Sequence, residues 1–284
     1  MFNRIYLELT NHCNLACTFC PPHRRNTRFL RPDEIKSRMG DVAKHTRDVY
    51  FHVKGEPLLS PYLKEALNEA LLHGLNVHLV TNGLLLPIHG DLVLNHPSVK
   101  TITISLHSFS ELDPTIRVLH LTHLKSWLNR IDDTHPHIRL RVWDGCSENY
   151  DTSRSLIRTL TGYELDEKPK VSFRHSLRRN LHVQSDVRFE WPTLDDAEKH
   201  PIGRCNAGLM MLAILVDGTT TPCCLDGEGI ITLGNVDDVP IETMIASERY
   251  RRFIQGMNDR KPTEALCRAC SYKRRFDAKP KEIL

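Results

Sequence analysis

Long apolar runs are missing from this 284-residue sequence, since none approaches the roughly 20 residues that a membrane-spanning helix needs. The first residues, MFNRIYLELT, alternate as a strand does and lack the charged start and apolar stretch of a secretion signal. An excess of one charge is also missing, because 38 lysines and arginines face 35 aspartates and glutamates, for a formal charge of +3. We therefore expect a cytoplasmic protein with no membrane partner, and so small a charge argues against nucleic acid as a partner.

Low-complexity segments and internal repeats are also absent from the sequence. Hydrophobic residues make up 40% of the chain and charged residues 26%, the balance of a folded protein with one large and one small domain. Cysteine, by contrast, is plentiful and odd in number, with nine residues that gather toward the two ends. In a reducing compartment, such cysteines indicate metal or cluster binding instead of disulfides.

The middle of the chain repeats a strand followed by a helix. The predicted strands start 24 to 44 residues apart, which is too wide for hairpins and leaves room for a helix in each gap. This repetition predicts an α/β fold with a parallel sheet. We interpret residues 177–204, where the pattern stops, as a connection. The predicted strands are Ile5–Leu9, Val49–Val53, Val77–Asn82, Thr101–His107, His137–Trp143 and Lys170–Ser176.

The strands alternate between apolar and polar residues, although parallel strands covered on both faces usually read as continuous apolar runs. Ile138 and Leu140, for example, alternate with Arg139 and Arg141. We expect a curved sheet with helices outside and a polar concave face that holds a ligand; a face simply turned to water is the alternative. Strand residues on the concave face carry an excess of positive charge, which predicts a polar, anionic substrate held partly by Arg141 or Arg174. Arg139 and Arg141 are candidates to bind either an anionic group of the substrate or another carboxylate ligand.

A first group of cysteines directly follows the first predicted strand. Cys13, Cys17 and Cys20 have the spacing C-x3-C-x2-C. Three thiolates on one loop can close around one face of a metal cluster and leave a fourth position open for reaction. The spacing favours an iron–sulfur cluster over structural zinc, which would need a fourth ligand such as His12 or His23.

This loop resembles the cluster motif of radical S-adenosylmethionine (SAM) enzymes, in which an aromatic residue, here Phe19, precedes the last cysteine. The resemblance implies that the three cysteines bind three irons of a 4Fe-4S cluster and that SAM chelates the fourth. It also implies a partial (β/α)6 barrel. One electron from the cluster would cleave SAM and yield a 5′-deoxyadenosyl radical that abstracts hydrogen from a substrate.

Further positions are similar to the same family. Lys54-Gly55-Glu56-Pro57 at the end of the second predicted strand resembles the family's Gly-Gly-Glu-Pro, which implies that Gly55 and Glu56 receive the SAM ammonium group. Lys54 departs from this pattern, because the family usually has glycine at this position. Asn82 and Ser105 end two further strands, where family members often hold SAM; both also suit an ordinary cap of a strand end.

A second group of cysteines lies near the C-terminus, around a turn signal at Asp217-Gly218 and a predicted helix at 241–257. Four thiolates can fully ligate a cluster or a zinc ion. The layout resembles the twitch domain, a shortened SPASM domain, and so implies an auxiliary 4Fe-4S cluster. Cys224 competes with its neighbour for one position. The four candidate ligands are Cys205, Cys223, Cys267 and Cys270.

Together these features predict a radical SAM partial barrel at 1–190 and a twitch/SPASM-like domain at 191–284. The layout is similar to the 2-deoxy-scyllo-inosamine dehydrogenase type, which implies oxidation of a polar small molecule with an electron donor such as flavodoxin or ferredoxin. A peptide-modifying maturase is one alternative. A non-catalytic metal-binding protein that contacts nucleic acid is the other.

Overall fold

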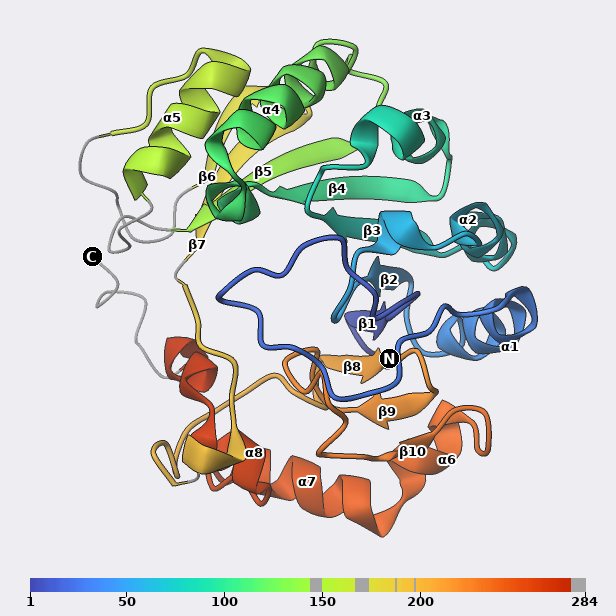
Figure 1. The fold of residues 1–284 in the computed structure, drawn as a ribbon. Coiled ribbons are helices and arrows are strands. Elements are labelled where there is room, and N and C mark those ends of the chain that lie inside the picture. The colour runs from blue at the N-terminus through green and yellow to red at the C-terminus, as the bar shows by residue number, and fades with distance from the viewer. Residues whose placement is uncertain (144–149, 167–173, 187, 197, 277–284) are drawn as a thin grey trace. The chain divides into compact units, whose positions relative to one another are not determined.

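The computed structural model describes the chain except for residues 144–149, 167–173, 187, 197 and 277–284 (Figure 1). Cys146 and the first part of the predicted strand at 170–176 therefore lie outside the described residues. The chain divides into two compact units. The first comprises residues 1–76 and 189–283, and the second residues 77–188.

The first unit is built on a sheet in the order β10-β9-β8-β1-β2. β1 pairs in parallel with β2 on one side and with β8 on the other, while β9 and β10 continue in antiparallel fashion. The β8–β9 hairpin confirms the turn expected at Asp217-Gly218, where Gly218 has a φ of +88°. The strands are β1 (Arg4–Leu7), β2 (Asp48–Phe51), β8 (Met211–Ile214), β9 (Thr219–Thr221) and β10 (Gly234–Asn235).

The helices of the first unit begin and end where the sequence has the corresponding signals. Pro32 opens α1, where its missing N–H costs no hydrogen bond, and Gly74 follows α2 in a left-handed conformation. A single helix was predicted at 241–257, but the structure breaks it at Ser247, whose side chain accepts from Tyr250 N and so starts a new helix. The helices are α1 (Pro32–Val42), η1 (Pro57–Leu59), α2 (Leu63–Leu72), η3 (Leu194–Asp196), α6 (Ile241–Ala246), α7 (Glu248–Asn258), α8 (Ala265–Ala269) and η4 (Ser271–Phe276).

The second unit holds the remaining strands in the order β3-β4-β5-β7-β6. Four of them are parallel, and β6 pairs with β7 in antiparallel fashion at the edge. Helices line one side of this sheet in Figure 1. The elements are β3 (Asn76–Thr81), α3 (Leu86–Asn95), β4 (Val99–Ser105), η2 (Leu106–Glu111), α4 (Pro114–Leu128), β5 (His137–Trp143), α5 (Tyr150–Thr161), β6 (Arg174–Arg178) and β7 (Leu181–Asp186).

The prediction of the sixth parallel strand was wrong. The strand expected at 170–176 overlaps β6, which runs antiparallel, and the strand parallel to β5 is β7, inside the segment interpreted as a connection. The two strands of this hairpin are joined after Arg178 by only two residues, and β6 is exposed on most of its length. β7 was missed because its sequence, LHVQSD, has only two apolar residues and so little of the signal from which sheet strands are recognised.

The predicted α/β class with a parallel-sheet core is confirmed, and the barrel is not closed. The alternation seen in the sequence is present as well. Ile138, Leu140 and Val142 of β5 are fully buried, while Arg139 and Arg141 on the other face are half-buried. Among the helices that the structure describes, none is long and apolar enough to cross a bilayer.

Candidate active site

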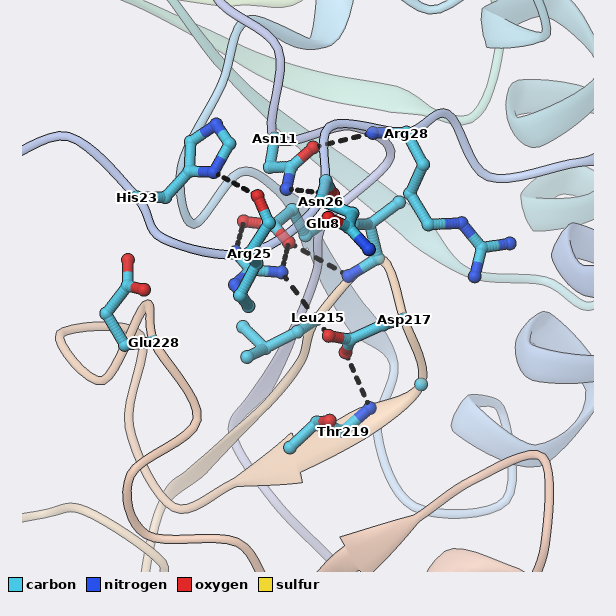
Figure 2. A network of polar contacts seen from close by, with 12 residues as sticks. Glu8, Asn11, His23, Arg25, Asn26, Arg28, Leu215, Asp217, Thr219 and Glu228 are labelled. Atoms are coloured by element: carbon cyan, nitrogen blue, oxygen red, sulfur yellow. Dashed lines mark hydrogen bonds and ion pairs between the residues drawn. The ribbon is translucent and has the colours of Figure 1, made fainter.

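The first cysteine group lies on the loop between β1 and α1, and hydrogen bonds tie the two ends of this loop together. Thr10 Oγ1 donates to the carbonyl of Arg28 at 2.8 Å, and Asn11 bonds both Asn26 O and Arg28 N at 3.0 and 2.9 Å (Figure 2). A short bridge between Thr10 and Phe29 completes the closure. The cysteines are therefore carried on a closed loop, which limits the entropy that ordering them would cost.

A buried ion pair fixes the same loop to the sheet (Figure 2). Glu8, directly after β1, has no exposed surface, and its two carboxylate oxygens accept from Arg25 at 2.8 Å each. The same carboxylate accepts from the backbone N–H groups of Lys54 at 3.0 Å and Val216 at 2.9 Å. Glu8 therefore joins three segments that are distant in sequence, and removing either charge would leave its partner buried and unpaired.

The three thiols of the loop, Cys13, Cys17 and Cys20, are half-buried. A turn brings the last two together, since Cys20 N donates to Cys17 O at 3.0 Å. Sulfur ligands on one loop are the donor set that iron–sulfur clusters use, so the residues fit such a group. His23, a candidate fourth ligand for zinc, instead places its Nδ1 2.9 Å from the carbonyl of Arg25. Phe19 is half-buried beside Cys20 in sequence.

Gly55 and Glu56 pack directly against the start of the cysteine loop. Glu56 N donates to His12 O at 2.8 Å, and one Glu56 carboxylate oxygen accepts from Leu58 N at 3.1 Å. Gly55 has a φ of +72°, and a Cβ atom there would lie 2.3 Å from the carbonyl oxygen of Thr10. Only glycine fits this position, because the neighbour is backbone and the conformation is left-handed.

We expect Gly55→Ala to destabilise the protein and to lower the iron bound by the loop. Gly162→Ala is the matched control, because Gly162 has a φ of +74° but no atom within 4 Å of its Cβ position. In the control, only the strain of alanine in a left-handed conformation should lower the free energy of unfolding, by about 1–2 kcal/mol. The melting temperature should then fall by a few degrees. Gly55→Ala should lower it by more than twice as much. Equal shifts in the two variants would contradict the contact with Thr10.

The second cysteine group lines one pocket in the first unit, with a cavity volume of about 30 Å³. Burial raises the pKa of Cys205, Cys267 and Cys270, and neighbouring thiols of the group add to the rise for Cys205 and Cys267. Buried thiols that resist ionisation this way release protons when they ligate a metal. The pocket wall is otherwise mostly apolar, with Ala207, Ile231, Met257 and Leu266. Four thiols around one pocket fit a fully ligated cluster.

The two adjacent cysteines 223 and 224 face different surroundings. Cys223 lines the pocket with the other three thiols, whereas Cys224 packs with Tyr6 and Val53 in a separate apolar cluster. A hydrogen bond with Cys224 raises the pKa of Cys223, and the same bond, aided by the Tyr6 hydroxyl, lowers that of Cys224. The placement of the two side chains supports Cys223 as the fourth ligand.

In the second unit, Ser105 and Asn82 both have hydrogen-bond partners at strand ends. Arg141 Nη2 donates to Ser105 Oγ at 2.7 Å, and Asn82 Oδ1 accepts from Leu84 N at 3.0 Å. His107, just after β4, stacks on Trp143 with ring centroids 4.0 Å apart. Burial holds the pKa of His107 well below its usual value, and Arg141 and Arg188 lower it further.

The three arginines predicted on the polar face share that face. The register pairs Arg139 with His182 and Arg141 with Gln184, and Gln184 also pairs with Arg174 of β6. Burial lowers the pKa of His182, and the charges of Arg174, His137 and Arg139 lower it further. Arg174 is exposed at the edge, whereas the other two arginines are half-buried. The register therefore places all three arginines on one face of the sheet.

Two contributors were missed from the sequence, namely Arg25 and Trp191. Arg25 neutralises Glu8, and the Trp191 ring lies 3.9 Å from the ammonium of Lys54. Glu8 is the single acidic residue among the polar and basic residues of the predicted concave face, so a cation is expected near it. The local sequence does not identify that cation as Arg25. Within the part of the chain that is described, no three His, Cys, Asp or Glu side chains are placed to hold a single metal ion.

Comparisons with known proteins agree with these two cysteine sites. Residues 7–137 match the model of the radical SAM superfamily, and residues 205–271 match an iron–sulfur cluster-binding domain, SPASM. GTP 3′,8-cyclase from Aquifex aeolicus (strain VF5) is 32% identical over 112 residues, 37% of this chain. That match spans 35% of the cyclase's own length.

Solved structures show the same fold at low sequence identity. BtrN, crystallised with AdoMet and 2-DOIA, is 15% identical with a TM-score of 0.56, over 95% of this chain and 93% of BtrN. SuiB from Streptococcus suis, bound to S-adenosylmethionine, is 14% identical with a TM-score of 0.61, over 95% of this chain and 70% of SuiB. The enzyme anSMEcpe with bound AdoMet is 14% identical with a TM-score of 0.57, over 89% and 82%.

The cluster-binding domain matches over the residues that carry the second cysteine group, and this domain implies an auxiliary iron–sulfur cluster. The radical SAM match includes the cysteine loop and the Gly55-Glu56 segment that packs on it. The chain is thus a radical SAM enzyme that uses SAM and a 4Fe-4S cluster, with a C-terminal SPASM-type domain for auxiliary iron–sulfur, and belongs to the radical SAM superfamily.

Proposed function

We propose that this enzyme oxidises a polar, anionic small molecule, with an auxiliary 4Fe-4S cluster as acceptor of the second electron. The observation that supports this most is the positive polar face of the second unit. There Arg139 and Arg141 are half-buried on β5. Burial depresses the pKa of His182 and of His107, and the charges of Arg139 and Arg141, respectively, add to this. Arginine forks at such positions suit a carboxylate or a phosphate.

In this proposal the first unit binds the cofactors. Cys13, Cys17 and Cys20 hold one cluster, and Glu56, with Gly55 and Phe19, receives SAM. When bound, the cluster and SAM supply a 5′-deoxyadenosyl radical that takes a hydrogen atom from the substrate. The electron enters from a donor such as flavodoxin or ferredoxin. The ligands proposed for the auxiliary cluster are Cys205, Cys223, Cys267 and Cys270.

The second unit supplies the remaining contacts. Ser105 and Asn82 are proposed to contact SAM, and the hydrogen bond from Arg141 fixes the Ser105 hydroxyl in one orientation. Arg139 and Arg174 are proposed to bind the substrate anion together with Arg141. Because Arg174 is exposed and water screens its charge, we expect it to contribute less than Arg139.

The proposal is tested by turnover of defined probes. Reconstituted enzyme is offered carboxylated, phosphorylated and uncharged amino sugars and polyols, and short peptides, and 5′-deoxyadenosine formed above the uncoupled background is measured. Stimulation and product with an anionic small molecule support the proposal. Turnover of peptides alone would instead assign the enzyme to peptide maturation. SuiB, one of the similar solved structures, has been crystallised with its precursor peptide SuiA.

With such a substrate, Arg139→Ala should raise KM about tenfold or more, since a charge-assisted hydrogen bond contributes about 1.5 kcal/mol or more. Uncoupled SAM cleavage should stay unchanged. Arg130→Ala is the control, because it removes the same charge from an exposed ion pair with Asp91. If the two variants have the same KM, Arg139 does not bind the substrate.

A further inference from the structure

Lys54 is a buried cation next to the cysteine loop. Only 5% of the residue is exposed, and its Nζ lies 2.7 Å from the carbonyl oxygen of Pro21 and 3.7 Å from Cys20 Sγ. The ammonium also lies over the ring of Trp191, 3.9 Å from the centroid. A carbonyl, a sulfur and an aromatic face are the groups that can stabilise a cation removed from water.

The backbone and the aliphatic part of Lys54 also have close contacts. Lys54 N donates to the buried Glu8 carboxylate at 3.0 Å, which fixes the backbone. Gly227 covers the stem, and a Cβ atom there would lie only 2.9 Å from Lys54 Cε. The chain therefore directs the ammonium to the end of the cysteine loop, at the motif position where this sequence departs from the family's glycine.

We propose that Lys54 raises the reduction potential of the cluster ligated by Cys20, by placing a positive charge and an N–H donor at the Cys20 sulfur. The inference rests on the proposed assignment of Cys20 as a ligand. Reduction adds one electron to the cluster, so a cation and a hydrogen bond at its sulfur stabilise the reduced form more than the oxidised form. Lys54 acts through Cys20 and is a positioning residue.

The test compares potentials in anaerobically reconstituted full-length protein. Dithionite supplies the electron in a redox titration, followed by electron paramagnetic resonance of the cluster signal that added SAM alters. Lys54→Met should lower the ratio of reduced to oxidised cluster about tenfold at a fixed potential, a negative shift of about 59 mV for one electron. Lys54→Arg keeps the charge and the donors, and should stay near the wild-type value.

Lys44→Met is the matched control, because it removes the same charge from a side chain that is 67% exposed. A Lys54→Met potential equal to that of the control overturns the proposal. If Lys54→Met assembles no such cluster, Lys54→Gln, which keeps a donor without the charge, is measured against the same control. A Cys20→Ala protein that kept the SAM-responsive signal would remove the premise and so fail separately.

Discussion

The Cys17→Ala protein is expected to form no 5′-deoxyadenosine from SAM while it retains the iron of the auxiliary site. In the proposed assignment Cys13, Cys17 and Cys20 each ligate a different iron, so losing one thiolate leaves an iron without its protein ligand. The second cysteine pocket lies on other segments of the chain and shares none of these residues. Total iron and sulfide should therefore fall by roughly half.

Thr18→Ala is the control for this variant, because Thr18 lies on the same loop but offers no thiolate. It should cleave SAM at a rate near that of the wild type. Iron, sulfide and 5′-deoxyadenosine are measured after anaerobic reconstitution of all three proteins. SAM cleavage retained in Cys17→Ala would falsify the assignment of this loop.

The second large effect is expected at the adjacent cysteines 223 and 224. Cys223→Ala should lose the auxiliary cluster, because this side chain lines the pocket with Cys205, Cys267 and Cys270. Cys224→Ala should retain the cluster, since the Cys224 side chain packs with Tyr6 in a separate apolar cluster. Both variants remove one buried thiol from neighbouring positions, so each controls for the other.

The measurement is iron content together with electron paramagnetic resonance of the reduced proteins, with SAM cleavage followed in parallel. Cys223→Ala should still cleave SAM without product, because the cysteine loop is intact. The reverse result, with the cluster lost only in Cys224→Ala, would show that the pocket rearranges when the cluster binds. A fall in zinc with unchanged iron would contradict the iron–sulfur assignment itself.

The sequence by itself determined the features that depend on local spacing. The thiols at positions 13, 17 and 20 lie on one short loop whatever the rest of the chain does. The alternation of β5 is also local, because side chains of a strand point to opposite faces by turns. The α/β class followed from the same regularity, since strands spaced by helices form parallel sheets.

Only the tertiary structure decided the features that depend on long-range pairing. β7 lies beside β5 because of its register with a strand about 40 residues away in the sequence. The polar sequence of β7 does not predict a strand there. Cys223 and Cys224 are neighbours with the same chemistry, and only packing puts one in the pocket and the other against Tyr6.

The partners of Lys54 show the same limit most clearly. Its contacts with Cys20 and Pro21 cross 34 and 33 residues, and Trp191 comes from a still more distant segment. A sequence pattern reports which side chains are polar and how they alternate, but not which distant group faces them. A buried charged group is costly unless it has a partner, so these contacts form only when the chain folds and brings the distant residues together.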